Sequence, residues 1–312
     1  MPLSVFFELV EIRTKLASIL PFAIGTLFAV TYFHTFNAVN TILFFMAMLL
    51  FDMMTTALNN LMDYRKAKDA HYQTTTNVIG RANLAPKLVE KMIIGMLIVA
   101  SLIGLVLVWR TDWLLLLMGM ACFAIDILYT WGPLPLSRLP LGEIFSGIVM
   151  GLGIPVIATY VNIAPGRLLA LDLGWPNVVL RGDFIAIIAL GLACVTPMAT
   201  IANIMLANNM SDLDEDQRNH RHTLPMYLGS WWSPRVYALL AYVGFLAIIF
   251  GVIFGALPAW TLVIELAWPL VIKNVHRFIR DPSKQRTFHT AVINLVIENG
   301  LLVLGLGMGA IL

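Results

Sequence analysis

Long, uninterrupted apolar stretches are the dominant pattern along this chain. A bilayer core of about 30 Å takes roughly 20 apolar residues per helix. Nine stretches approach or reach that length, at about 16–33, 40–61, 92–109, 113–131, 143–161, 183–207, 236–254, 257–273 and 289–311. Strands of a membrane β-barrel would alternate apolar and polar residues, and these stretches do not. The pattern therefore predicts an all-α polytopic membrane helical bundle of about nine transmembrane helices.

Composition supports a membrane protein and excludes other classes. Of 312 residues, 59% are hydrophobic and 12% are charged, whereas a soluble domain is about half apolar and about a quarter charged. The same figures exclude a disordered chain, which is polar and rich in charge. A net charge of +2 does not provide a basic face for nucleic acid. We expect a single integral membrane domain over 1–312, made of two half-bundles at about 1–142 and 143–312.

The positive charges predict an orientation. With nine spans, the N-terminus shares one side of the membrane with the loops that follow the even-numbered helices. That side holds 17 of the 20 Lys and Arg residues, and the other holds only Arg110, Arg167 and Arg181. Lys and Arg are enriched in cytoplasmic loops. We therefore expect a multi-pass plasma-membrane protein with a cytoplasmic N-terminus and an external C-terminus.

Two acidic clusters follow even-numbered helices, so they lie on the same side whichever way the protein inserts. Asn59 and Asp63 are four residues apart at the end of the second predicted helix, and Asp69 follows. Asn208, Asp212 and Asp216 repeat the spacing of four at the end of the sixth. Residues spaced by four share a helix face.

Two facing sets of carboxylates would repel one another unless a cation lay between them. Mg²⁺ prefers oxygen ligands, typically one or two carboxylates completed by water and substrate phosphates. The clusters thus fit two Mg²⁺ ions that hold a diphosphate, with the nearby Arg and Lys side chains neutralising its remaining charge. The alternative is that these acids are solvated loop charges, which is the usual meaning of a charge run in a cytoplasmic loop.

The residues of both clusters resemble a known family. The first is similar to the Asn-x-x-x-Asp-x-x-x-x-x-Asp motif of the UbiA superfamily of intramembrane prenyltransferases, and the second to its Asp-x-x-x-Asp motif. The segments 221–224 and 228–229 also resemble that superfamily. Within it, 79–81, 129–136 and 141–143 are most similar to the 1,4-dihydroxy-2-naphthoate polyprenyltransferases of menaquinone biosynthesis.

The resemblance implies a Mg²⁺-dependent aromatic prenyltransferase. It implies that a polyprenyl diphosphate, an isoprenoid, ionises and that its allylic cation is attacked by 1,4-dihydroxy-2-naphthoate with loss of carbon dioxide. On this basis Asn59, Asp63 and Asp69 are expected to hold one ion, and Asp212 and Asp216 the other. Expected substrate-binding residues are Asn59, Asn208, Arg81, Arg221, Lys15, Lys66 and Arg138. Asp63 and Asp212 count as catalytic.

Two further residues are candidates for catalysis. Tyr129 is expected to stabilise the allylic cation through its ring face, although Tyr near a helix end also fits an interfacial aromatic belt. Asp126 lies one turn earlier within a predicted span, where acids are costly and often functional. We expect it to contact the acceptor hydroxyls or orient Tyr129, or else to bond a neighbouring helix. Asp52 shares a face with Asn59 and Asp63, which places it deeper in the same cavity.

Three other functions stay open at this point. The acceptor of a prenyltransferase of this superfamily can instead be 4-hydroxybenzoate, homogentisate or a glyceryl phosphate. A secondary transporter also shows half-bundle symmetry and intramembrane acids, but its coupling residues usually lie near the midplane. A non-catalytic carrier with a decayed site is the third, and the intact acidic motifs argue against it.

Overall fold

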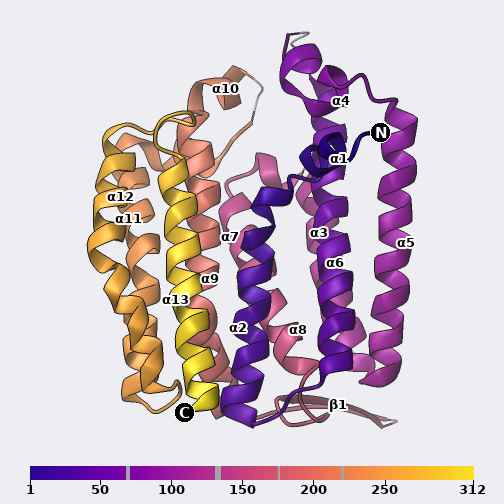
Figure 1. Ribbon diagram of the computed structural model, residues 1–312, viewed down its shortest axis with the longest axis vertical. Coiled ribbons are helices and arrows are strands. Elements are labelled where there is room, and N and C mark those ends of the chain that lie inside the picture. Colours follow the sequence, from indigo (N-terminus) through magenta and orange to yellow (C-terminus); the bar gives the residue numbers. More distant parts are fainter. Residues whose placement is uncertain (68–70, 131–134, 175, 219–220) are drawn as a thin grey trace.

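The computed structural model describes residues 1–67, 71–130, 135–174, 176–218 and 221–312. Figure 1 shows a bundle whose long helices run roughly side by side along the long axis. The elements outside the hairpin are α1 (Leu3–Leu9), η1 (Ile12–Lys15), α2 (Leu16–Phe33), α3 (Ala38–Lys66), η2 (Tyr72–Thr76), α4 (Val78–Arg81), α5 (Pro86–Arg110), α6 (Trp113–Thr130), η3 (Leu136–Arg138), α7 (Gly142–Ser146), η4 (Gly147–Gly153), α8 (Ile154–Tyr160), α9 (Phe184–Ser211), α10 (Leu213–Arg218), α11 (Leu224–Ile253), η5 (Ala259–Ala267), α12 (Trp268–Arg280) and α13 (His289–Ile311).

The helical membrane fold expected from the sequence is confirmed. Within the described residues, eight helices are long and apolar enough to cross a membrane. They comprise η1 with α2, then α3, α5, α6, the continuous segment from α7 through η4 to α8, α9, α11 and α13. The ninth predicted span, 257–273, differs from expectation. It is divided between η5, a 3₁₀ helix, and α12, so neither part alone has the length of a spanning helix.

The loop after α8 contains a hairpin that the span pattern did not predict. Strands β1 (Leu169–Gly174) and β2 (Asn177–Gly182) pair antiparallel, with Leu169 opposite Gly182. In Figure 1 the hairpin lies at the lower end of the bundle, together with the C-terminus, whereas the N-terminus, α4 and α10 lie at the upper end. The two termini therefore lie at opposite ends of the bundle.

The largest buried apolar cluster joins the beginning of the chain to its second half. Ile24 and Phe28 of α2 pack with side chains from α9, α11, η5, α12 and α13. A second cluster links α1, α3, α4 and α5, and a third links α3, α5, α6 and α8. Because α2 belongs to the largest cluster, the main core crosses the expected boundary at 142, and the division into half-bundles stays a prediction.

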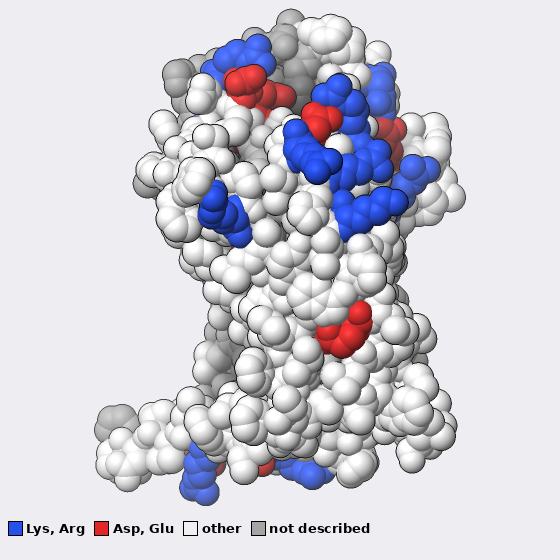
Figure 2. Space-filling view, turned by 90° about the vertical axis from the view of Figure 1, so that its left-hand side faces the viewer, with Lys and Arg blue, Asp and Glu red and all other residues white. Residues whose placement is uncertain are grey.

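Charged side chains gather at the ends of the molecule. Figure 2 shows Lys and Arg concentrated with some acids on the upper part of one face, a broad and mostly uncharged band below them that is interrupted by one acidic patch, and a few charges at the lower end. Uncharged surface of this kind suits the hydrocarbon layer, where an unpaired charge is costly. The upper end is the one that carries the ends of α3 and α9, and thus the two acidic clusters.

Candidate active site

The first acidic cluster lies on the last turns of α3. The Asn59 side-chain oxygen accepts a hydrogen bond from the Thr130 hydroxyl at the end of α6, which fixes the amide. Asp63, one turn later, is exposed. Within the described part of the chain its carboxylate has no hydrogen-bond partner. Asp63 is therefore free to bind a ligand.

Several positive charges act on Asp63, and most come from distant parts of the sequence. Lys66 lies on the same helix, whereas Arg138, Arg221 and Lys284 follow in three other segments. Arg138 ends η3, and its carbonyl accepts a 3.0 Å hydrogen bond from the His222 backbone N–H. This bond ties the loop after α6 to the loop after α10. The structure thus brings Asp63 together with the cations of the second cluster.

The second acidic cluster lies across a break between two helices, although i-to-i+4 backbone bonds join Asn208 to Asp212 and Asp212 to Asp216. Helix α9 ends at Ser211, Asp212 caps it, and a separate short helix, α10, begins at Leu213. Asn208 is on the last turn of α9, where its carbonyl accepts from the Asp212 N–H at 3.1 Å. The break turns the chain at Asp212, so Asp212 and Asp216 lie on different elements. Their carboxylates therefore have different surroundings.

Asp212 is partly exposed, whereas Asp216 is buried. The Asp212 carboxylate pairs with Lys284, which is exposed. Asp216 is only 3% exposed, and its carboxylate accepts from the Thr223 hydroxyl at 3.2 Å and lies 3.6 Å from the Arg221 guanidinium. Burial raises the pKa of Asp216 above its usual value, and Arg221 and Thr223 act against this rise. Asp216 thus anchors Arg221 at the edge of the site.

Unpaired buried polar atoms surround these clusters. The Tyr129 hydroxyl and Nε of Arg221 have no hydrogen-bond partner among the described residues. The charges that act on Tyr129 are those of Glu143, Arg221 and Asp126. Buried polar groups are nearly always hydrogen-bonded in folded proteins, so these two atoms are available to a ligand or to water.

Glu143 is a residue of the site that the sequence reasoning did not select. It is 2% exposed, and one of its oxygens accepts from the Asn209 side chain at 2.8 Å, while the other has no partner in the described chain. The bond joins α7 to α9 beside the second cluster. The sequence feature that could have identified Glu143 is its position: it is an acid at the start of a predicted span, in the segment 141–143 that carried the family resemblance.

Lys15 has a different environment from the one expected. It is 2% exposed, and its amine donates to a carboxylate oxygen of Asp52 at 2.6 Å, to the Asp52 carbonyl at 3.2 Å and to the Thr56 hydroxyl at 2.7 Å. Ser18 donates to the other Asp52 carboxylate oxygen at 2.6 Å. An ammonium has three donors. All three of Lys15 are used, so none is left for a diphosphate oxygen.

The remaining expected residues are at the same end of the bundle. Arg81 ends α4, is exposed and pairs with Glu8 of α1. Lys66 is exposed at the end of α3. Asp69 lies outside the described residues, as do positions 131–134 of the segment that resembles the naphthoate enzymes.

An apolar cavity of about 450 Å³ lies among α2, α3, α5, α6, η4 and α8. Its wall is apolar apart from a few polar groups, among them Asp52 and Asp126. Asp52 of α3 and Asp126 of α6 line the same cavity. The volume lies within the range of about 300–1,000 Å³ typical of ligand pockets.

The donor set suits a hard divalent cation that a ligand helps to hold. Asp63, Asp212 and Asn59 offer oxygen atoms, which Mg²⁺ prefers. No group of three His, Cys, Asp or Glu side chains in the described ranges is arranged to hold a metal by itself. Oxygen atoms from a phosphate substrate and water would therefore complete the coordination, as is common for Mg²⁺.

Comparison with known proteins gives the family. The model of the UbiA prenyltransferase family matches residues 18–296. The chain belongs to this family of prenyltransferases. The resemblance stated from the sequence is thereby confirmed, and a secondary transporter and a decayed carrier are no longer needed to explain the fold.

Relatives of this UbiA-family protein include a curated enzyme and solved structures. The 1,4-dihydroxy-2-naphthoate octaprenyltransferase of Bacillus subtilis (strain 168) is 27% identical over 282 residues, which cover 89% of this chain and 83% of that protein. A UbiA homolog from Aeropyrum pernix K1 is 18% identical with a TM-score of 0.68, over 96% of this chain and 97% of that one. A homolog from Archaeoglobus fulgidus bound to GPP and Mg²⁺ is 14% identical with a TM-score of 0.58, over 99% and 100%. The two structures share the fold.

Proposed function

We propose that this prenyltransferase transfers a polyprenyl group from polyprenyl diphosphate to 1,4-dihydroxy-2-naphthoate with decarboxylation, giving the quinol form of demethylmenaquinone, carbon dioxide and diphosphate. The observation that carries the proposal is the likeness to the Bacillus subtilis naphthoate octaprenyltransferase over 89% of this chain. The accessible Asp63 and Asp212 at one end of the bundle support it, because a diphosphate substrate needs a charged site next to an apolar one.

The proposed metal ligands come from both acidic clusters. Asn59 and Asp63 on α3, with Asp69 beyond it, would hold one Mg²⁺, and Asp212 and Asp216 the other, with Asn208 on the last turn of α9. When bound, Mg²⁺ supplies Lewis-acid stabilisation of the charge that develops on the departing diphosphate. The homolog structure with GPP and Mg²⁺ bound is consistent with this assignment.

The bond changes of the proposed reaction balance without a further reactant. The allylic C–O bond breaks, and its electron pair leaves with the diphosphate. The ring carbon that carries the carboxylate donates an electron pair to the allylic carbon and forms the new C–C bond. Carbon dioxide then leaves, and the electrons of the broken C–C bond return to the ring.

Side chains of this chain would position the diphosphate and the cation. Arg221, Arg138, Lys66 and Arg81 are the candidates for diphosphate oxygens, since guanidinium groups match such anions in geometry and charge. Arg221 is the strongest of them, because its buried Nε has no partner in the described chain. Tyr129 would present its ring to the allylic cation.

The apolar cavity suits the organic parts of the substrates. Its apolar wall would accept the isoprenoid tail, which is as apolar as lipid. Asp126 and Asp52, on the same wall, would contact the acceptor hydroxyls. Lys15 would then act as a positioning residue that holds Asp52. We also propose a plasma-membrane location with the acidic clusters on the cytoplasmic side, in line with the excess of positive charge there.

An acceptor panel tests the proposed substrate. Purified protein is incubated with a polyprenyl diphosphate, Mg²⁺ and one of four acceptors: 1,4-dihydroxy-2-naphthoate, 4-hydroxybenzoate, homogentisate or a glyceryl phosphate. We expect a prenylated, decarboxylated product and diphosphate with the naphthoate only. Turnover with another acceptor and none with the naphthoate would refute the substrate while leaving the family unchanged.

A further inference from the structure

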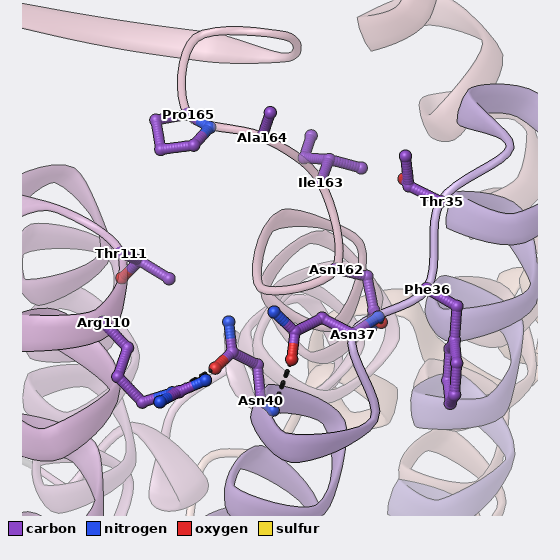
Figure 3. Close-up of a pocket in the computed structure, with 10 residues that line it drawn as sticks. All are labelled: Thr35, Phe36, Asn37, Asn40, Arg110, Thr111, Asn162, Ile163, Ala164 and Pro165. Atoms are coloured by element: carbon purple, nitrogen blue, oxygen red, sulfur yellow. Dashed lines mark hydrogen bonds between the residues drawn. The ribbon is translucent and has the colours of Figure 1, made fainter.

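A second cavity lies at the opposite end of the bundle from the acidic clusters. It has a volume of about 340 Å³. Three segments form it: the loop from α2 into α3, the end of α5, and the turn after α8 that carries 162–165. Figure 3 shows Arg110, Asn40 and Asn37 side by side on one side of the pocket, opposite the turn.

The pocket is rich in hydrogen-bond donors that have no acceptor. Arg110 donates through Nε to the Asn40 side-chain oxygen at 2.6 Å, and its two terminal nitrogens have no partner in the described chain. The Asn37 side-chain oxygen accepts from the Asn40 N–H at 3.1 Å, which leaves the Asn37 amide nitrogen without a partner among those residues. The buried Thr35 hydroxyl is likewise unpaired there.

The charge of the lining residues favours an anionic ligand. Arg110 is the single cation among its ten lining residues, and none of the ten is acidic. Asp112, two residues further along, is engaged elsewhere: one oxygen caps α6 at the Leu114 N–H, and the other accepts from the Tyr160 hydroxyl at 2.5 Å. The lining therefore offers a positive charge and N–H donors to an anion, and it offers no carboxylate to a cationic group.

Hydrogen bonds hold the polar side chains in place before any ligand binds. The Asn162 side-chain oxygen accepts from the Asn37 N–H and from the Thr41 hydroxyl, both at 2.8 Å. The Asn40 amide donates to the Val161 carbonyl at 2.9 Å. A site held in this way loses little conformational entropy on binding.

Neighbouring aromatic residues indicate the depth of the pocket in the membrane. Trp109 is 85% exposed and Trp113 is 68% exposed, and both lie within three residues of Arg110. Phe36, which lines the pocket, is 59% exposed. Exposed Trp residues at helix ends mark the level of the lipid headgroups. Val39 and Ile42 of α3 are exposed nearby, where they can contact an acyl chain.

We propose that this pocket binds the headgroup of an anionic phospholipid, with phosphatidylglycerol as the type, from the leaflet opposite to the active site. The lipid phosphate pairs with the free nitrogens of Arg110. The Asn37 amide and the Thr35 hydroxyl bind the headgroup oxygens. A zwitterionic lipid is disfavoured, because its ammonium group finds no carboxylate in the lining. The site is independent of prenyl transfer, which takes place at the other end of the molecule.

Lipid binding to purified protein tests the proposal. The protein in detergent is titrated with phosphatidylglycerol or phosphatidylcholine, and bound lipid is counted by native mass spectrometry. Both lipids carry the phosphate, so the preference arises from the choline ammonium, which Arg110 repels and no carboxylate of the lining binds. We expect the wild type to prefer phosphatidylglycerol by about tenfold, the order of magnitude of one such repulsion at a partly exposed site. Arg110→Gln should abolish the preference. Asn37→Asp should do the same, because it keeps the helix cap and adds a negative charge to the pocket.

A control variant and a competition experiment distinguish the possible outcomes. Arg181→Gln removes an exposed arginine of the hairpin at the same end, which pairs with Asp172 at 2.8 Å, and should keep the preference. Equal binding of both lipids by the wild type would overturn the proposal, as would an unchanged preference in folded Arg110→Gln and Asn37→Asp. If inorganic phosphate competes with phosphatidylglycerol at equal concentration, the pocket binds a free anion and the lipid assignment is wrong.

Discussion

At the residue scale, the site depends on how each charged side chain is partnered. Lys15 and Asp52 form a nearly buried ion pair, with side chains 3% and 16% exposed. Asp63, on the same helix as Asp52, is exposed and has no partner in the described chain. The Lys15–Asp52 pair therefore stabilises the fold, whereas Asp63 is available to a ligand.

Replacing Lys15 by Met should destabilise the protein. The substitution leaves the Asp52 carboxylate with only Ser18 as a side-chain donor, and breaking one side of a buried pair costs about 3–5 kcal/mol. Thermal unfolding of the purified protein measures the effect as a lower midpoint. Lys87→Met is the matched control, because Lys87 is exposed. Equal midpoints for the two variants would show that the pair contributes nothing.

The sequence identifies the candidate acids of the site, but it does not identify the residues that contact them. Scarcity of charge and spacing of four single out Asp63 and Asp212. The partners are distant in sequence: Lys284 is 72 residues from Asp212, and Asn209 is 66 residues from Glu143. Such pairs arise from helix packing, which periodicity within one helix does not encode. Lys15 is a further example, since its partner Asp52 is 37 residues away.

At the element scale, close helix contacts depend on single glycines. A Cβ at Gly151 of η4 would lie 2.4 Å from the backbone nitrogen and Cα of Met198 in α9. These are backbone atoms, which cannot rotate away as a side chain would. The contact sets the distance between the α7–α8 span and α9, and thus the position of Glu143 relative to Asn209.

Gly151→Ala should therefore force these helices apart. Overpacking of this kind costs about 1–3 kcal/mol. A lower midpoint of thermal unfolding is the expected result. Gly191→Ala in α9 is the control, since a Cβ there meets no atom within 4 Å, and its midpoint should not fall. The packing account is wrong if Gly151→Ala is as stable as the control.

Most spanning helices were predictable from continuous apolar runs, and three local features were not. The segment 257–273 is apolar enough to span, but η5 is 3₁₀ helix and breaks its regularity. The β1–β2 hairpin lies in a loop too short and too mixed in polarity to stand out from the spans. Helix α9 ends at Ser211, although the spacing of four continues to Asp216, so spacing alone does not show this end.

At the scale of the whole molecule, the two ends differ in charge. Figure 2 shows the upper end rich in Lys and Arg, and the lower end poor in them. The loop between α12 and α13, which includes Lys284 and Arg286, lies at the end of the acidic clusters, because Lys284 pairs with Asp212. The hairpin lies at the other end.

Cysteine labelling in intact cells should report this orientation. Gln285→Cys, between α12 and α13, should be protected from a membrane-impermeant thiol reagent, and Asn177→Cys in the hairpin should react. Both positions are exposed. The parent protein is the control, because Cys122 and Cys194 lie within spanning helices. The opposite labelling pattern would place the acidic clusters outside the cell.

The central claim is that the acids on α3 and after α9 bind one Mg²⁺-diphosphate substrate together. Its most direct test is the rate of diphosphate release from a polyprenyl diphosphate with 1,4-dihydroxy-2-naphthoate, for wild type, Asp63→Asn, Asp212→Asn and the solvated control Asp214→Asn. We expect release to require Mg²⁺, to fall at least about 10²-fold in each of the first two variants and to stay near wild type in the control. Release that survives removal of Mg²⁺, or near-normal turnover in folded Asp63→Asn, would contradict the account.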